Sequence, residues 1–185
     1  MKTVSFKFKT DCEELRQKIA EDSRACSSMR RYAFNRLQEG LSTKETYGLL
    51  GKLFPIVNSH LRNSALRSAS GLSTSWNTRK RDGEKLHFGK FKRYCKKLIT
   101  KEEYKDSRNT GILSEGEAVH FGNRFFKIDT ENSQIIWKRN VREHYDLILV
   151  ENLSKKRKAL LSKLQLLMSE KKIPVTVRLK TTPFT

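Results

Sequence analysis

The stretch of this sequence best suited to chemistry runs from Trp76 to Lys97, where cations and aromatic rings alternate. It holds nine lysines and arginines against two carboxylates. Lysine and arginine bind phosphates without reading base sequence, and flat rings stack on unpaired bases. The stretch therefore predicts a surface that grips a nucleic acid, and a solvated basic loop is the alternative. The candidate contact residues are Arg79, Lys80, Arg81, Lys90, Phe91, Lys92, Arg93, Tyr94, Lys96 and Lys97.

The charge of the whole chain points to the same class of partner. The 185 residues carry a formal net charge of +19, which a compact domain tolerates most easily beside a polyanion. Nucleic acid is the first choice and an anionic membrane surface the second. No apolar run approaches the roughly 20 residues that span a bilayer, and the N-terminal segment lacks the apolar core of a signal peptide. We therefore expect no membrane partner and a prokaryotic cytoplasmic, nucleoid-associated location.

Residues that could hold a metal or catalyse a reaction are scattered. Cys12, Cys26 and Cys95 are odd in number and form no CxxC pair, so a zinc ribbon is not expected. The four histidines are also far apart in the sequence. The glutamates at 102–103 and 115–117 lie near helix caps or loops, without the partners that two-metal catalysis needs. The residues therefore predict no catalytic group, no metal site and no cofactor in this chain.

The elements that position the basic stretch begin with helices. Apolar residues recur every three or four positions from Leu15 to Leu37, which predicts a helix ending near Gly40. Its flank carries a basic ridge, for which a solvated helix face is the alternative: Arg30, Arg31, Tyr32, Asn35 and Arg36. A capping box at Ser42 and Glu45 predicts a short helix to about Leu53. Pro55 and Gly71 are expected to begin and end the next helix, and Ser73 or Thr74 to start another.

The second half of the chain changes character. Residues 86–99 have no clean period and predict a strand or an extended basic loop, and Thr100 and Glu103 predict a capped helix. A loop is expected over 111–116. Four short β-rich runs follow at 118–121, 125–129, 134–138 and 145–150, typical of an antiparallel meander. A helix over 154–168 and a strand after Pro174 complete the order. The alternating residues Val4, Phe6 and Phe8 predict a first strand, which must pair with the later ones.

In the order of its motifs the chain resembles the N-terminal half of TnpB (OrfB)-type transposon-encoded RNA-guided nucleases and the related type V CRISPR effectors. The opening strand resembles the first strand of their wedge domain, and residues 29–36, MRRYAFNR, resemble the first helix of their recognition lobe. Residues 88–93, FGKFKR, resemble the basic stretch that leads back to the wedge domain. Residues 122–128, GNRFFKI, resemble the strand that follows.

The resemblance implies an α+β fold: an oligonucleotide-binding-like antiparallel β-barrel, the wedge domain, interrupted by a helical recognition lobe. Residues 1–10 would be the first wedge strand, 11–85 the recognition lobe, and 86–185 the basic seam with the barrel and one helix. A guide RNA and the target DNA are the implied partners. The resemblance adds Asn123, Arg124 and Lys127 on the barrel to the nucleic-acid-binding residues. Such a protein reads the shape and backbone of the guide–target duplex.

The sequence departs from the family in its catalytic part. The family cuts DNA with a RuvC-type domain, for which Mg²⁺ is expected, and the carboxylates of that domain are not seen in these 185 residues. We therefore expect a binding portion that does not cleave by itself. Two alternatives stay open: half of a split or truncated endonuclease, completed by a RuvC-containing polypeptide or a second copy, and a generic basic RNA-binding protein.

Overall fold

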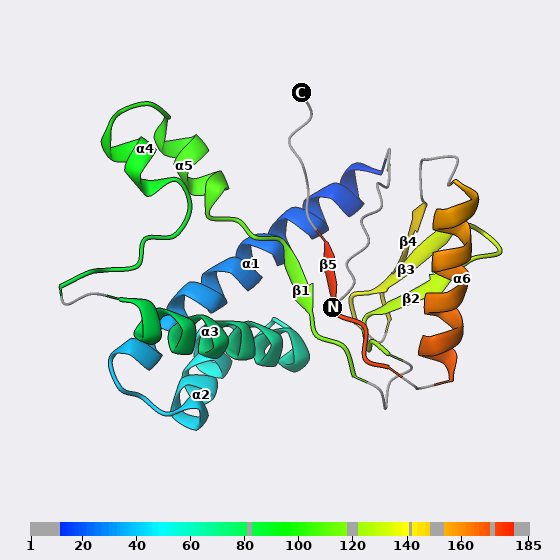
Figure 1. Ribbon diagram of the computed structural model, residues 1–185, viewed down its shortest axis with the longest axis horizontal. Coiled ribbons are helices and arrows are strands. Elements are labelled where there is room, and N and C mark those ends of the chain that lie inside the picture. Colours follow the sequence, from blue (N-terminus) through cyan, green and yellow to red (C-terminus); the bar gives the residue numbers. More distant parts are fainter. Residues whose placement is uncertain are drawn as a thin grey trace. The chain divides into compact units, whose positions relative to one another are not determined.

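A computed structural model describes residues 12–80, 83–117, 122–140, 142–148, 154–170 and 173–179 (Figure 1). The chain divides into two compact units, each of which is taken by itself. Unit 1 comprises Met1–Lys18 and Ser114–Val177, and unit 2 comprises Ile19–Leu113 and Arg178–Thr185. The division predicted from sequence follows the expected parts of a wedge domain and a recognition lobe, and it stays a prediction. The expected first strand at residues 4–8 lies outside the described residues.

Helices predominate in unit 2 and strands in unit 1. The elements are α1 (Glu13–Gln38), α2 (Thr43–Leu53), α3 (Ser59–Arg79), α4 (Phe91–Cys95), α5 (Lys101–Ser107), β1 (Ile112–Ser114), β2 (Phe126–Asp129), β3 (Gln134–Lys138), β4 (His144–Ile148), α6 (Lys155–Ser169) and β5 (Val177–Leu179). The predicted α+β class is confirmed, since the structure combines helices with small antiparallel sheets. Among the described residues the strands form one sheet of two strands and one of three. A closed barrel is not assembled from these strands.

Helix α1 follows the predicted apolar stripe. Ile19, Cys26, Met29 and Ala33 are buried, as the three-and-four spacing predicts. Two serines share the buried side, and one of them organises the chain nearby. The Ser27 hydroxyl accepts a hydrogen bond from the backbone N–H of Thr110 at 2.8 Å and donates to Asn109 Oδ1 at 3.1 Å. These bonds hold the segment between α5 and β1 against α1.

Helices α2 and α3 confirm one prediction and correct two. The capping box of Ser42 and Glu45 is present at the start of α2. Helix α3 begins at Ser59 and not at Pro55, because Asn58 provides the cap: its side chain accepts from the backbone N–H of His60 at 2.9 Å. Helix α3 also continues through Gly71 to Arg79. Burial of Ala69 and Ser73 on both sides of Gly71 outweighs its helix penalty of about 1 kcal/mol.

The predicted strand or loop over 86–99 is partly wrong. Residues 84–88 lack regular structure, but Phe91–Cys95 form the short helix α4. The capping box of Thr100 and Glu103 is present and starts α5, as predicted. The predicted loop over 111–116 is also wrong, because β1 lies within it and is hydrogen-bonded to β5. Helices α4 and α5 lie beside each other in unit 2 (Figure 1).

Unit 1 is built on an antiparallel sheet with the order β2-β3-β4. The register pairs Phe126 with Trp137 and Trp137 with Tyr145, which confirms the meander over its last three strands. The expected run at 118–121 lies outside the described residues. Helix α6 packs on β2 through a core of Ile128, Leu161 and Met168. This core thus combines one apolar residue of β2 with two apolar residues of α6.

Candidate nucleic-acid interface

Four rings and one guanidinium hold α4 and α5 together as a helical hairpin, residues 87–108. Tyr94 and Tyr104 stack with centroids 4.8 Å apart and planes 10° apart. His87 and Phe91 stack at 4.0 Å and 12°, and Phe91 also meets Tyr104 at 6.0 Å. The Arg108 guanidinium lies 4.8 Å from the centroid of the Tyr104 ring. Phe91 and Tyr94, predicted as base-stacking residues, thus use ring faces to build the hairpin.

The start of the hairpin is fixed by a close approach of the Gly89–Lys90 backbone to the side chains of Ser107 and Arg108. The Lys90 N–H donates to Ser107 Oγ at 2.9 Å, and that hydroxyl donates to the Tyr104 carbonyl at 2.7 Å. Gly89 has φ +70°, and a Cβ at this position would lie 2.6 Å from Ser107 Oγ and 2.8 Å from Arg108 Cγ. Only glycine fits here without displacing α5.

Two contacts join the hairpin to α1 within unit 2. The Phe88 ring meets the Phe34 ring edge-on, with centroids 5.5 Å apart. The Arg31 guanidinium donates to the carbonyl of Arg108 at 3.2 Å and to the Ser28 hydroxyl at 3.0 Å. Arg31, predicted as a nucleic-acid contact, therefore holds the end of the hairpin against α1. The sequence signal for this role is weak, because Arg31 and Arg108 are far apart in the chain.

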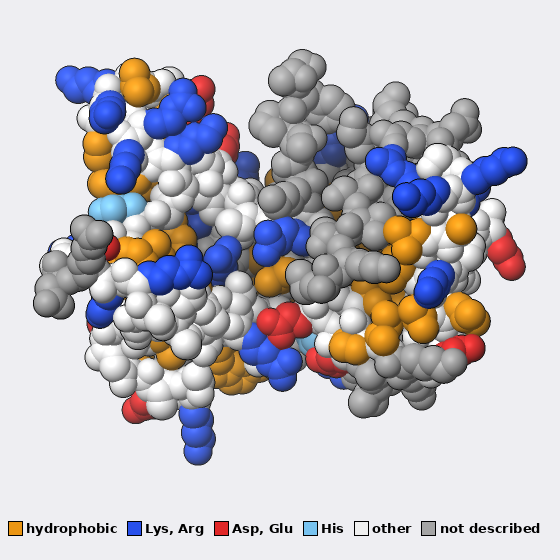
Figure 2. Space-filling view, viewed as in Figure 1, with side chains coloured by type: hydrophobic (Ala, Val, Ile, Leu, Met, Phe, Trp, Pro, Cys, Tyr) orange, Lys and Arg blue, Asp and Glu red, His pale blue; other side chains and the backbone are white. Residues whose placement is uncertain are grey.

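Five exposed cations lie on α4 and the residues that flank it, and they are called the hairpin cations. All five side chains are exposed: Lys90, Lys92, Arg93, Lys96 and Lys97. Within the described part of the chain no carboxylate forms an ion pair with any of them. Figure 2 shows Lys and Arg side chains gathered over α4 and α5. Exposed cations without carboxylate partners among the described residues are suited to binding phosphates.

Lys97 is held in a backbone conformation that side chains rarely adopt. Its φ is +55°, in the left-handed region. The Leu98 N–H donates to the Arg93 carbonyl at 3.0 Å, and the Lys97 N–H donates to the Tyr94 carbonyl at 2.9 Å. This is a Schellman-type end to α4, at a position where glycine is usual. A lysine there costs conformational energy and adds a cation to the hairpin.

The predicted ridge on α1 is only partly at the surface. Asn35 is exposed, whereas Arg30 and Tyr32 are half-buried. The Arg36 guanidinium lies 5.2 Å from the centroid of the Tyr32 ring and forms an ion pair with Glu39. The five predicted residues are thus together on one helix, but they do not form one uniform solvated face.

The remaining predicted residues fall into different places. Arg79 and Lys80 are exposed at the end of α3, and Arg81 lies outside the described residues. Arg124 and Lys127 are exposed in unit 1. Asn123 is only 5% exposed, and its amide is fully used inside the unit. Its Oδ1 accepts from the backbone N–H groups of Phe125 and Phe126, which gives Asn123 a structural role.

The described residues contain neither a metal cluster nor a membrane-spanning helix. No cluster there combines three or more His, Cys, Asp or Glu side chains in a way that could hold a metal ion. None of the described helices has the length and apolarity to cross a bilayer. The expected Mg²⁺ requirement of a RuvC domain stays a prediction about a domain outside these residues.

Sequence reasoning missed two groups that bear on the site. Tyr104 completes the ring stack of the hairpin, and the capping box at Thr100 was the available signal for the helix that presents it. Arg178 lies in β5 and faces Arg30 across a small pocket in unit 2. No local pattern could indicate that pairing, since 148 positions separate the two arginines.

Comparison with known proteins gives one match. The family model described as SSO2105 N-terminal domain matches residues 1–184. No curated protein and no solved structure is significantly similar to the chain.

Proposed function

The chain belongs to the SSO2105 N-terminal domain family, and we propose that it binds structured RNA through the hairpin cations. The observation that carries the proposal is the absence of ion pairs, within the described residues, at five exposed cations on one short hairpin. The net charge of +19 supports the same partner, because a polyanion neutralises repulsion that the chain cannot neutralise internally.

The arrangement of the rings favours a particular kind of nucleic acid. Proteins that bind single strands without sequence preference usually offer aromatic faces to successive bases. In the hairpin, Tyr94 and Tyr104 stack face to face, and Phe91 stacks on His87. The cations remain available for phosphates, so the surface suits a folded RNA whose shape and backbone are read.

Within this function we propose the role implied by the TnpB resemblance: binding a guide RNA and, through the guide, target DNA, without cleavage by this chain. The proposal includes an oligonucleotide-binding-like barrel interrupted by a helical recognition lobe, and a cytoplasmic, nucleoid-associated location. Its support is the order of the sequence motifs. The reading frame and flanking DNA downstream of Thr185 test it: a transposon end or a CRISPR array there, with RuvC carboxylate motifs nearby, would support it. Ribosomal RNA as the main crosslinked partner would contradict it.

The RNA-binding surface can be tested by neutralising two matched groups of cations. One variant changes Lys90, Lys92 and Arg93 to glutamine, and the control changes Lys155, Lys156 and Arg157, which are also exposed, at the start of α6. Both variants lose the same charge. We expect the hairpin variant to raise the Kd for a structured RNA about tenfold or more, because three phosphate contacts are lost. The control should change the Kd much less.

Fluorescence anisotropy with a labelled hairpin RNA measures both affinities, and circular dichroism confirms that each variant retains its helices. Neutralising the first turn of α6 removes cations from the unfavourable end of the helix dipole, so the control is expected to fold. Equal losses of affinity in the two variants would contradict a specific surface and leave only net charge as the cause. No loss in either variant would contradict phosphate binding by these cations.

A further inference from the structure

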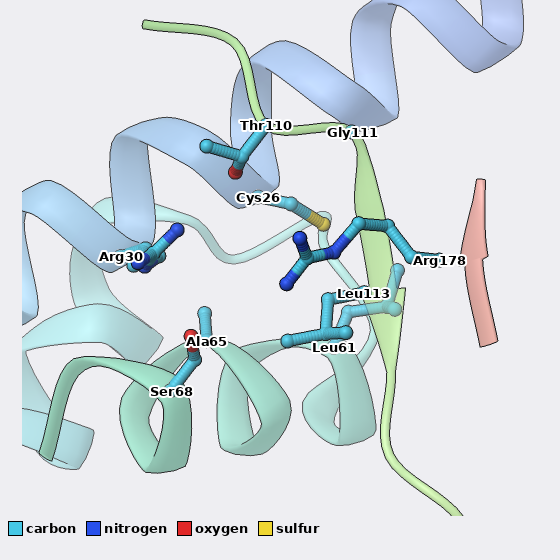
Figure 3. A pocket seen from close by; sticks show the side chains of 9 residues that line it. All are labelled: Cys26, Arg30, Leu61, Ala65, Ser68, Thr110, Gly111, Leu113 and Arg178. Atoms are coloured by element: carbon cyan, nitrogen blue, oxygen red, sulfur yellow. The ribbon is translucent and has the colours of Figure 1, made fainter. Parts of the chain in front are cut away.

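Two arginines converge on a small pocket within unit 2. The pocket has a volume of about 10 Å³ and lies between α1, α3, the segment before β1, and β5 (Figure 3). Arg30 enters it from α1 and Arg178 from β5, and the Arg178 guanidinium points into its centre. We propose that this pocket binds a single phosphate group, held between the two guanidinium groups.

None of the described residues that line the pocket carries a negative charge. Its other walls are the Cys26 thiol, the hydroxyls of Ser68 and Thr110, and apolar or backbone atoms. Burial first, and the Asp22 charge second, raise the pKa of the Cys26 thiol to about 12, so the thiol is neutral. Both arginine side chains lack hydrogen bonds and ion pairs to the described residues, and Arg30 Nε is fully buried.

The electrostatics of the pocket are unfavourable unless an anion is bound. Arg30 is half-buried, and burial, followed by the charge of Arg178, lowers its pKa. Like charges brought together in a partly desolvated pocket repel each other, and an oxyanion between them reverses the sign of the interaction. Guanidinium groups match the oxygens of a phosphate with paired hydrogen bonds, and two forks offer more donors than one carboxylate can accept.

The side chains of the two arginines differ in how far they can move. Because the Arg178 side chain can move outward, the pocket can admit a group larger than water. Arg30 is on a rigid helix, whereas the Arg178 side chain is exposed and can withdraw toward solvent. Since about 10 Å³ does not hold a phosphate, a phosphate would enter as the Arg178 side chain shifts outward, and the shifted guanidinium would face it from the solvent side while Arg30 faces it from α1. The phosphate could belong to an RNA backbone or to a free anion, and only the first source rests on the proposed function.

Thermal unfolding of the full chain tests the pocket directly. We expect sodium phosphate to raise the Tm of the wild type above that in sodium chloride of equal ionic strength, because a ligand of the folded state stabilises it. Arg178→Gln should abolish this increment. In chloride alone Arg178→Gln should raise the Tm, since it removes the repulsion from Arg30. Arg24→Gln, exposed on the same helix α1 and outside the pocket, is the control that should keep the phosphate increment.

RNA affinity of the same variants identifies the source of the phosphate. A higher Kd for structured RNA in Arg178→Gln than in Arg24→Gln would assign the pocket to the RNA backbone. A phosphate-specific Tm increment with equal RNA affinities would assign it to a free anion. The proposal is overturned if phosphate and chloride give the same Tm and the two variants bind RNA equally. Tight RNA binding by the wild type in that case would leave the function of the hairpin cations standing.

Discussion

At the scale of single residues, the Asn123 side chain forms hydrogen bonds with several backbone groups, a role that the sequence did not predict. Its Oδ1 accepts from two backbone N–H groups and from the Ser114 hydroxyl, and its amide donates to the Val175 carbonyl at 2.9 Å. The chain before β2 and the chain before β5 are thereby joined through one side chain. Because the buried amide of Asn123 has all its groups paired within the protein, we assign it a structural role and not a ligand-binding one.

Asn123→Ala should destabilise unit 1 by about 3 kcal/mol, because several buried backbone groups lose their partners. Urea unfolding followed by the fluorescence of Trp137, which is fully buried in unit 1, measures the change. A Trp76→Phe background removes the other tryptophan of the chain. Arg124→Ala, an exposed neighbour, should leave the midpoint almost unchanged. A similar small shift in Asn123→Ala would contradict the structural role.

At the scale of elements, the hairpin combines a rigid base with one strained residue. Lys97 holds a left-handed conformation that costs an L side chain roughly 1 kcal/mol or more, and that glycine adopts freely. The strain is local to the end of α4, where the hydrogen bonds of Leu98 and Lys97 close the helix. At this position glycine would give the more stable helix end, whereas lysine adds a positive charge to the hairpin.

Lys97→Gly should slow hydrogen exchange of the α4 amides and at the same time weaken RNA binding about twofold to fourfold, because it relieves strain and removes one cation. Hydrogen-exchange mass spectrometry and anisotropy measure the two effects. Lys96→Gln is the matched control, since it removes a neighbouring cation without changing the backbone preference. The control should weaken binding with no gain in protection. Unchanged affinity in Lys97→Gly would exclude Lys97 from the RNA contact.

Local chemistry predicted the elements well wherever one residue type determines the outcome. The capping boxes at Ser42 and Thr100 located two helix starts, and a short run of β-favouring residues located β3. The predictions that were wrong concern elements whose structure is determined by tertiary packing. Gly71 continues a helix because buried neighbours hold it, and β1 is a three-residue strand whose partner β5 follows much later in the chain. The cations of the candidate site were predicted from composition, but the stacking of Tyr94 on Tyr104 required tertiary structure.

At the scale of the whole molecule, the net charge of +19 acts on folding and on binding in opposite directions. Repulsion among 39 lysines and arginines opposes compaction, whereas the same cations attract a polyanion. Salt screens both interactions, because the Debye length roughly halves between about 50 and 200 mM. The two effects can therefore be separated in one titration.

Raising sodium chloride from about 50 to about 200 mM should raise the Tm of the free chain and weaken RNA binding on the order of 100-fold, as expected for five phosphate contacts. Calorimetry and anisotropy follow the two quantities. The variant neutralised at Lys90, Lys92 and Arg93 should show a shallower dependence of log Kd on log salt than the wild type. An affinity that does not change with salt would contradict binding through phosphates.

The division of the chain into interleaved units has a consequence for protein synthesis. Unit 2 comprises residues 19–113 and a final segment that begins at Arg178. A ribosome therefore releases α1 to α5 and the whole described sheet of unit 1 before it releases the strand that carries Arg178. Until then Arg30 lacks its partner in the pocket. A nascent chain can thus present the hairpin cations early, whereas the arginine pair forms only after Arg178 has emerged from the ribosome.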